Sequence, residues 1–552
     1  MKSVFILAVA TVAALGVLVA LPVAFVVLQA VFPRLAEGSL GDPFGAWGAV
    51  LSQPGTLALV GGTLKLGLSV AAVSAAIGIP LGALRGLFRL PLARLWDLLF
   101  LIPFLLPPYI AALSWTMALQ PRGFLQQLAG WHLGPLLFSP AGVALVMGLA
   151  IFPVVYFAVS RSMAASGSRL AEAARVFGAG PWRAFFRVTL PLSLPAIGAS
   201  LLLAFTLAIE EYGVPAALGA QSGVNVLTTA IERRLADWPI DLPGAALLSL
   251  VLVALALTAF AVQRALLPGA VSRPPPASRR RWRRPSWALA PARAAAVRAG
   301  RAGRAGGGGR AAGVHAGGGA DAQPVRRTVA RQPDAGQFRR AVPGARRGLG
   351  RAVHQPVAGG GAALLTGAVG LLAAWCVAGR HVPGAPAIDG LALLPAALPG
   401  VVVGVGLILA WNQPFWPATP YGTWGILLLS YTCLLLPYPV RYVGAALAQI
   451  GPNLEAAARV HGASAARALR RIVLPLVLPA LAASMLMVFA VASRELVTSL
   501  LLAPAVQTVS IYVWRQFEQG SVGEGMAMAT VAVAASLTLM LGASVIRRRG
   551  AD

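Results

Sequence analysis

Four charged side chains within apolar stretches are the first candidates for chemistry in this sequence. Glu210 and Glu211 end one apolar stretch, and Arg494 and Glu495 end another. Charges inside a membrane segment are costly, and they commonly mark a substrate or ion pathway. Two acidic groups toward the outer end of a pathway would suit a cationic cargo or organise a gate. The interpretation that we favour over direct contact with cargo is a pair of helix-end carboxylates bonded to nearby donors, such as Arg494 with Glu210 or Glu495.

Catalytic chemistry has no support in the pattern of residues. A phosphate-binding loop needs Gly-x4-Gly-Lys-Ser/Thr, and the two lysines, Lys2 and Lys65, stand outside any such pattern. The five histidines include no His-Glu-x-x-His pair. Cys376 and Cys433 lie inside apolar runs, so we interpret them as small buried residues rather than as a disulfide or a thiolate metal site. The sequence therefore predicts no catalytic residue, no metal site and no cofactor bound by this chain.

A different kind of site is indicated by the stretch EAARVFGAGPWRAFFRVTLP, which occupies residues 172–191. Paired alanines on a short helix permit close approach of another surface, and glycine gives the backbone freedom to turn at the tip. The basic stretch beyond the tip can present arginines to an acidic partner or to lipid head groups. A single loop of this kind could also be an interfacial amphipathic helix. The residues that define the pattern are Glu172, Ala173, Ala174, Gly178, Leu190 and Pro191.

A second copy of this loop favours its interpretation as a surface that contacts a partner. Residues 170–211 match residues 454–495 at 22 of 42 positions. Ala456 aligns with Glu172, and the acidic residue Glu455 stands one position earlier, so its role stays open. The residues that define the second copy are Glu455, Ala457, Ala458, Gly462, Leu474 and Pro475.

The repeat also includes an aspartate followed by two prolines. The pattern Asp-x5-Pro-x3-Pro begins at Asp97 and recurs at Asp389, in both cases upstream of the loop. The shared order means that the two halves were duplicated in the same sense. We expect both aspartates to lie at helix N-termini, where the helix dipole favours a negative charge. The prolines are expected to kink membrane helices.

The elements that must position these residues are membrane helices. The chain has 552 residues, of which 58% are hydrophobic and 11% charged, whereas soluble domains carry about 25% charged residues. Apolar stretches near or above the roughly 20 residues that cross a bilayer recur along the chain. They predict an all-α polytopic membrane protein with two parallel repeats of about six transmembrane helices, eleven spans being legible. The stretches are 4–30, 62–84, 98–119, 141–160, 190–212, 243–263, 358–379, 388–411, 423–445, 474–500 and 524–546.

The placement of arginine predicts the orientation of these spans. Basic loops follow the second and fourth stretches, whereas the loop after the fifth carries Glu232, Asp237 and Asp241. Cytoplasmic loops retain Lys and Arg. The N-terminus and both repeated loops are therefore expected in the cytoplasm.

An even number of spans must separate two loops on one side of the membrane, yet only five are legible between them. The missing helix should lie in the segment 271–357, which is rich in Arg, Gly, Ala and Pro. One interpretation is a disordered cytoplasmic linker; we prefer an out-of-frame translation of a GC-rich gene. The segment holds 19 arginines against Asp321 and Asp334, so it carries much of the net charge of +28. That charge therefore does not indicate a nucleic-acid partner.

The loop pattern resembles the EAA loop of permease subunits in bacterial ABC importers. The resemblance implies a type I ABC importer permease fold in the bacterial inner membrane. It also implies that each loop sits in a cleft of a cytoplasmic ABC ATPase, with two ATPase copies using ATP and Mg, and that an extracytoplasmic substrate-binding protein delivers the cargo. The predicted units are 1–270 with its loop at 170–191, and 358–552 with its loop at 454–475.

The cargo is suggested by resemblance rather than by residue chemistry. The stretches EEYGVPAALGA, VLTTAIERR, SRELVTSLLLAP and VQTVSIYVWRQ look like those of ferric-iron importer permeases. Thiamine, polyamine, sulfate and phosphonate importers have related permeases and remain alternatives. A secondary transporter driven by an ion gradient is a further alternative, since such proteins also use internal repeats.

Overall fold

The described part of the protein is built from helices. The computed structural model describes residues 2–88, 90–166, 169–266, 354–378, 382, 384–414, 416–450, 453–519 and 522–549. No β-strand occurs among these residues. The expectations for the segment 271–357 lie outside the described residues, apart from 354–357, which begin a helix.

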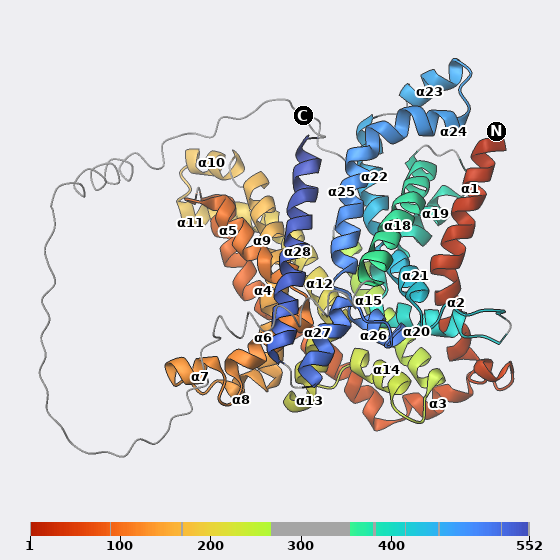
Figure 1. Ribbon diagram of the computed structural model, residues 1–552. Coiled ribbons are helices and arrows are strands. Elements are labelled where there is room, and N and C mark those ends of the chain that lie inside the picture. Colours follow the sequence, from red (N-terminus) through yellow and green to blue (C-terminus); the bar gives the residue numbers. More distant parts are fainter. Residues whose placement is uncertain are drawn as a thin grey trace, which may run out of the picture. The chain divides into compact units, whose positions relative to one another are not determined.

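Helices of the first half run from the N-terminus to residue 266 (Figure 1). After the first, Val4–Val31, the membrane-length helices among them begin at prolines or a leucine, and all of them are largely apolar. The elements are α1 (Lys2–Leu15), η1 (Gly16–Ala20), α2 (Leu21–Val31), η2 (Leu35–Glu37), α3 (Gly45–Leu51), α4 (Pro54–Leu87), α5 (Ala93–Leu105), α6 (Pro108–Leu119), α7 (Phe124–Ala129), α8 (Gly134–Leu137), α9 (Pro140–Ser166), α10 (Arg169–Val176), α11 (Pro181–Ala184), η3 (Phe185–Thr189), α12 (Leu190–Glu210), α13 (Gly213–Ser222), α14 (Leu227–Ala236) and α15 (Leu242–Leu266).

Helices of the second half begin at residue 354. They repeat the order of long helices, bent pair and short surface helices seen in the first half. The elements are α18 (His354–Ala378), α19 (Ala385–Leu393), η4 (Leu394–Ala397), α20 (Gly400–Trp411), α21 (Trp424–Leu435), α22 (Pro437–Ile450), α23 (Asn453–Val460), α24 (Ala465–Ala468), η5 (Leu469–Val473), α25 (Leu474–Ala492), α26 (Val497–Leu502), α27 (Val509–Glu518) and α28 (Val522–Arg549).

All eleven predicted apolar stretches fall on helices. Among the described residues, seven helices are long and apolar enough to cross a membrane, or up to ten if each bent pair is one span. The last predicted stretch lies on α28, in which the described apolar residues run from Gly523 to Ala535. The fold class predicted from the sequence is confirmed.

The prolines at 107 and 399 break membrane helices rather than only kinking them. The pair α5 and α6 bends by 92° and the pair α19 and η4 with α20 bends by 113°. The bends occur at Leu106 and Pro107 and at Leu398 and Pro399, where the backbone is extended. Because proline disfavours helical backbone at the residue before it, each pair of helices is broken rather than curved. The breaks bring non-helical backbone into the interior of the helical bundle.

Neither Asp97 nor Asp389 lies at a helix N-terminus, so that expectation is wrong for both: each is the fifth residue of its helix. The Asp97 carboxylate pairs with Arg85 of α4 at 3.0 Å. The same carboxylate accepts a hydrogen bond from the hydroxyl of Tyr156 in α9 at 2.7 Å. A polar cluster therefore ties three helices of the first half together.

We expect Asp97→Asn to lower the free energy of unfolding by about 1–3 kcal/mol, because it leaves the half-buried Arg85 guanidinium without its counter-charge. Thermal unfolding of the purified chain in detergent measures the change. Asp389→Asn is the matched control, since Asp389 holds the same place in α19 and has no ion pair within the described ranges. Equal unfolding midpoints for the two variants would contradict this role of the cluster.

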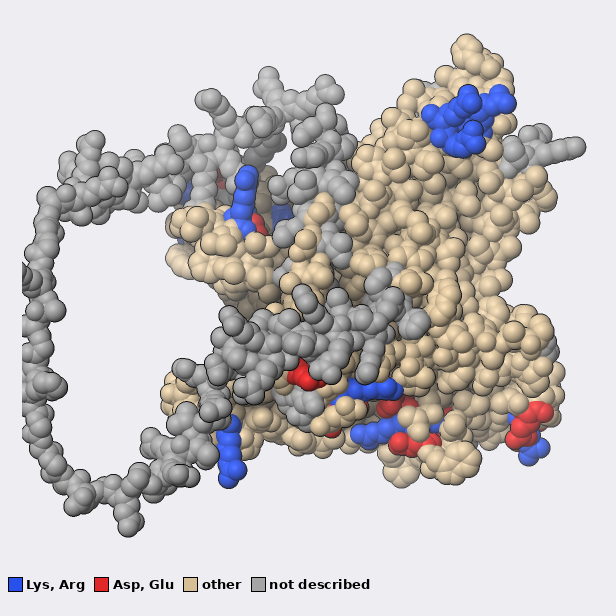
Figure 2. Space-filling model, in the orientation of Figure 1, with Lys and Arg blue, Asp and Glu red and all other residues tan. Residues whose placement is uncertain are grey.

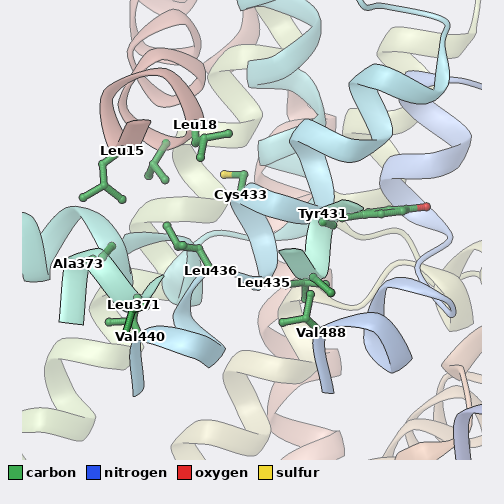
Figure 3. Close-up of a cluster of buried hydrophobic side chains, with 14 of the residues drawn as sticks. Leu15, Leu18, Leu371, Ala373, Tyr431, Cys433, Leu435, Leu436, Val440 and Val488 are labelled. Atoms are coloured by element: carbon green, nitrogen blue, oxygen red, sulfur yellow. The ribbon is translucent and has the colours of Figure 1, made fainter. Parts of the chain in front are cut away.

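The first helices of the chain pack against the second half. Leu15 and Leu18 share a buried cluster with Leu371 of α18 and Cys433 of α21 (Figure 3). Helix α2 also lies close to α20, since a Cβ on Gly406 would stand 2.6 Å from the carbonyl oxygen of Pro22. Small residues permit such close approach of membrane helices. The two halves therefore share one core, in which both cysteines are buried and free.

Candidate coupling loops and membrane pathway

The repeated loops have the same construction in both halves. The first three elements of the first loop have counterparts in the second that begin and end 284 residues later, and the membrane helix that follows them begins at the same offset. Each set comprises a two-turn helix, a turn, a four-residue helix and a π-helical segment that enters the membrane helix. The matched sets are α10, α11, η3 and α12, and α23, α24, η5 and α25. Both loops lie at the same end of the helical bundle (Figure 1).

A left-handed glycine ends the first helix of each loop. Gly178 has a φ of +83° and Gly462 a φ of +80°. Beyond α10, the Ala179 amide donates to the carbonyl of Ala174 at 2.9 Å and the Gly178 amide to that of Arg175 at 3.0 Å. These two bonds form the Schellman cap, in which a left-handed residue satisfies the last carbonyls of a helix.

The second loop has the equivalent bond, from the Ala463 amide to the carbonyl of Ala458 at 3.0 Å. A Cβ placed on Gly178 or Gly462 would meet nothing within 4 Å. Glycine is therefore favoured at both positions by backbone conformation alone, because L residues with a Cβ pay for a left-handed conformation.

The tip of each loop exposes apolar side chains. Val176 is 85% exposed and Phe177 is 90% exposed, and in the second loop Val460 is 84% exposed. Exposed apolar groups that gather at one place mark interaction sites. The first loop adds Trp182 and Phe186, whose rings stack at 6.1 Å.

The second loop lacks the aromatic pair of the first. Ala466 and Arg470 hold the places of Trp182 and Phe186. Lys and Arg side chains gather over the end that carries α23 and α24, whereas acidic and basic residues mix at the opposite end (Figure 2). The two tips share an apolar contact point, but they differ in the surface around it.

The remaining residues of the pattern start the membrane helices. Leu190 and Pro191 are the first residues of α12, and Leu474 and Pro475 are the first residues of α25. In each copy the proline, which has no backbone N–H to donate, follows the π-helical segment within one continuous helix, Pro181–Glu210 or Ala465–Ala492. The π-helical segments run directly into α12 and α25, so each loop is continuous with a membrane helix.

Glu455 has a different environment from Glu172. Glu172 is exposed on α10, whereas Glu455 is half-buried and accepts a hydrogen bond from the indole nitrogen of Trp375 at 3.3 Å. Trp375 is fully buried in α18. Glu455 thus attaches the second loop to a membrane helix of its own half. Ala173 and Ala457 are exposed, and Ala174 and Ala458 are half-buried.

Glu211 and Glu495 cap short helices. Glu211 Oε1 accepts from the Gly213 amide at 2.7 Å, where α13 begins. Glu495 Oε1 accepts from the Thr498 amide at 3.2 Å, within the first turn of α26. A carboxylate at a helix N-terminus satisfies amides that have no partner within the helix. The geometry agrees with the favoured interpretation of these two residues as helix-end carboxylates.

Glu210 and Arg494 hold equivalent places in the repeat but behave differently. Arg494 Nη1 donates to the carbonyl oxygen of Phe104 at 3.2 Å. This hydrogen bond connects the second half to the first half at the break between α5 and α6. Glu210 lines a cavity of about 410 Å³ together with Glu495. Its Oε1 atom is buried and has no hydrogen-bond partner among the described residues.

Sequence reasoning missed the other polar groups of this cavity, which are Tyr431, Tyr438, Arg441 and Tyr442. They lie around the bend between α21 and α22, which is 43° at Leu436. The signal available in the sequence was the run LLLPYPVRY, in which tyrosines and an arginine interrupt an apolar stretch at two prolines. No group of three or more His, Cys, Asp or Glu side chains within the described ranges could hold a metal ion.

A helical membrane protein with two parallel repeats, each carrying a loop that enters a membrane helix, is the architecture of a transport permease. The family model for the inner membrane component of binding-protein-dependent transport systems matches residues 78–271 and 367–549. The chain belongs to this family. It is a permease subunit of an ABC importer, a multi-pass protein of the inner membrane, with two fused permease units.

Several curated proteins are similar to this chain. The ferric transport system permease protein FbpB of Actinobacillus pleuropneumoniae is 23% identical over 499 residues, which are 89% of this chain and 71% of that protein. The molybdenum transport system permease protein ModB of Escherichia coli (strain K12) is 31% identical over 153 residues, 27% of this chain and 67% of that protein. PhnV of Salmonella typhimurium, named for 2-aminoethylphosphonate transport, is 30% identical over 157 residues, 28% of this chain and 58% of that protein.

Proposed function

We propose that the two loops couple this permease to a pair of cytoplasmic ABC ATPase subunits. The observation that carries the proposal is the duplicated construction of the loops, each with an exposed apolar tip beyond a capped helix. A pair of ATPase subunits has two equivalent clefts, and two equivalent loops at one end of the bundle fit them. The ATPase hydrolyses ATP with its own Mg, and this chain forms the path of the cargo across the membrane.

The proposed topology follows from the partner. The loops at 170–191 and 454–475 and the N-terminus face the cytoplasm, and the permease units are 1–270 and 358–552. An extracytoplasmic substrate-binding protein delivers cargo to the opposite end. Basic residues around the second loop support this orientation, since cytoplasmic segments are rich in Lys and Arg.

Replacing an exposed tip residue tests the ATPase contact. We expect Phe177→Asp to reduce recovery of the ATPase with the tagged full-length permease by about tenfold, the order of effect for an apolar hot-spot residue. Phe124→Asp is the matched control, because Phe124 is also an exposed phenylalanine but lies on α7, away from the loops. Equal recovery with both variants would count against docking at the tip.

We further propose ferric iron as the cargo. The FbpB match extends over most of the chain, whereas the ModB and PhnV matches each cover less than a third of it. The side chains at the ends of α12 and α25 also favour a cation, since three carboxylates, Glu210, Glu211 and Glu495, stand near one guanidinium, Arg494. Uptake of radiolabelled ferric iron, compared with molybdate, tests this choice, and uptake of molybdate alone would overturn it.

A further inference from the structure

A cavity of about 410 Å³ lies where the end of α12 meets the two bent helix pairs of the second half. Glu210 is contributed by the first half, and the remaining lining comes from the second half. The backbone side of the cavity is formed by Ala396, Leu398 and Gly400, which flank the break before α20. The cavity therefore combines charged side chains with non-helical backbone.

The repeat relates this cavity to a position in the first half that Arg494 occupies. Glu210 corresponds to Arg494, and Ala396 corresponds to Phe104 of the other half. Beside Phe104 of the first half, the corresponding position is taken by the Arg494 guanidinium, which donates a hydrogen bond to the Phe104 carbonyl at 3.2 Å. In the second half, the equivalent place beside Ala396 is occupied by the carboxylate of Glu210.

An ionised carboxylate cannot make the hydrogen bond that Arg494 donates to a backbone carbonyl. An ionised carboxylate only accepts hydrogen bonds, so in its charged form Glu210 cannot donate to a backbone carbonyl. Its Oε1 atom is buried without a hydrogen-bond partner among the described residues. A buried polar atom without a partner costs free energy. A positively charged ligand would remove that cost.

The surroundings of Glu210 also favour a cation. The helical segment from α19 through η4 ends at Ala397, and the C-terminal end of a helix carries partial negative charge. Glu495 lies across the cavity, with its Oε1 atom 4.0 Å from where a Cβ on Gly400 would stand. The lining thus holds two carboxylates against one guanidinium, that of Arg441, whose side chain is exposed.

The neutral ligands available are oxygens. Tyr431, Tyr438 and Tyr442 line the cavity, and the Tyr431 hydroxyl is already bonded to Ser499 Oγ at 2.7 Å. Carboxylate, phenol and carbonyl oxygens together form a hard ligand set, which suits hard multivalent cations rather than soft ones.

We propose that this cavity binds a hard multivalent cation through oxygen ligands, with Glu210 as the principal charged ligand, during passage of the cargo between the two halves. The site rests on the proposed function only in that the cargo is such a cation. Arg494, by contrast, occupies the equivalent position beside Phe104 in the first half. Because Arg494 occupies the equivalent position in the first half, the cavity beside Glu210 is the position that we propose for the cation.

Terbium luminescence tests the site directly. Tb3+ is a hard trivalent cation, and tyrosine rings near a bound ion sensitise its emission. We expect the full-length chain in lipid nanodiscs to show saturable Tb3+ luminescence. Glu210→Gln should weaken the affinity by about tenfold or more, since loss of a group that only supports a ligand already costs about tenfold or more at metal sites. Glu37→Gln is the matched control, since Glu37 is an exposed carboxylate on η2 outside the cavity.

The outcomes separate the site from the permease function. Equal Tb3+ affinities for Glu210→Gln and Glu37→Gln would overturn the site and leave ATP-coupled transport standing. Molybdate binding that survives Glu210→Gln but is lost in Arg441→Gln would also overturn it in favour of an oxyanion. If Glu210→Gln does not fold, Tyr438→Phe with Tyr442→Phe tests the same ligands. Tb3+ binding that depends on Glu210, without any ATP-driven uptake, would overturn the proposed function and keep the site.

Discussion

Gly178→Val and Gly462→Val are each expected to reduce ATP-driven uptake by about tenfold or more while ATP hydrolysis continues and the protein stays in the membrane. Both glycines are left-handed, and a β-branched residue in that conformation costs about 1–3 kcal/mol. A cost of about 1.4 kcal/mol changes an equilibrium tenfold. The helix cap would open, and the tip would no longer be held over its membrane helix. Gly178→Glu and Gly462→Glu should behave in the same way.

The matched controls are Gly178→Asn and Gly462→Asn. Asparagine visits the left-handed region at lower cost than other residues with a side chain, and no neighbouring atom obstructs a Cβ at either position. The asparagine variants should therefore retain most of the uptake. The measurement is the ratio of cargo moved to ATP hydrolysed, with membrane abundance checked by quantitative blotting. Normal ratios in both glutamate variants would refute the coupling role of the loops.

Arg494→Leu should lower the free energy of unfolding by about 1.5–3 kcal/mol, the range for hydrogen bonds that involve charged groups. Arg494 reaches from the end of α25 to the Phe104 carbonyl at the end of α5, and leucine leaves that carbonyl without this donor. The two halves would then lose a connection at the break of the first. Uptake is expected to fall with stability.

Thermal unfolding of the purified chain measures this effect. Arg494→Lys keeps the charge but presents one donor group instead of a planar fork, so it should fall between wild type and Arg494→Leu. Arg34→Leu is the control for losing an arginine, since Arg34 is exposed and precedes η2. If Arg494→Leu and Arg34→Leu unfold at the same temperature, Arg494 does not hold the halves together.

The loops could be predicted from the sequence because their signal is local. Helix-forming alanines, a glycine and a leucine–proline pair fix a short helix, a turn and the start of a membrane helix. The spacing is equal in the two copies, and the element boundaries in the structure follow it. The position of the apolar spans was predictable for the same reason, since length and composition determine a span.

The pathway could not be predicted to the same extent, because it depends on contacts between distant segments. Prolines at 107 and 399 indicated kinks, but bends of 92° and 113° depend on what the freed backbone meets. The cavity joins Glu210 to tyrosines more than 200 residues away. The packing of α1 and α2 on the second half is likewise invisible in the sequence, since uniformly apolar helices do not reveal which face contacts a neighbour.

The ATP dependence of uptake is the most direct test of the proposed coupling between this permease and an ABC ATPase. Proteoliposomes would contain the full-length permease and the ATPase, with the binding protein and ferric iron on the side opposite the loops and ATP on the loop side. We expect uptake that requires ATP, the ATPase and the binding protein together, and that is lost in the Gly178→Val, Gly462→Val double variant. Uptake driven by an ion gradient without ATP, or unchanged in the double variant, would contradict it.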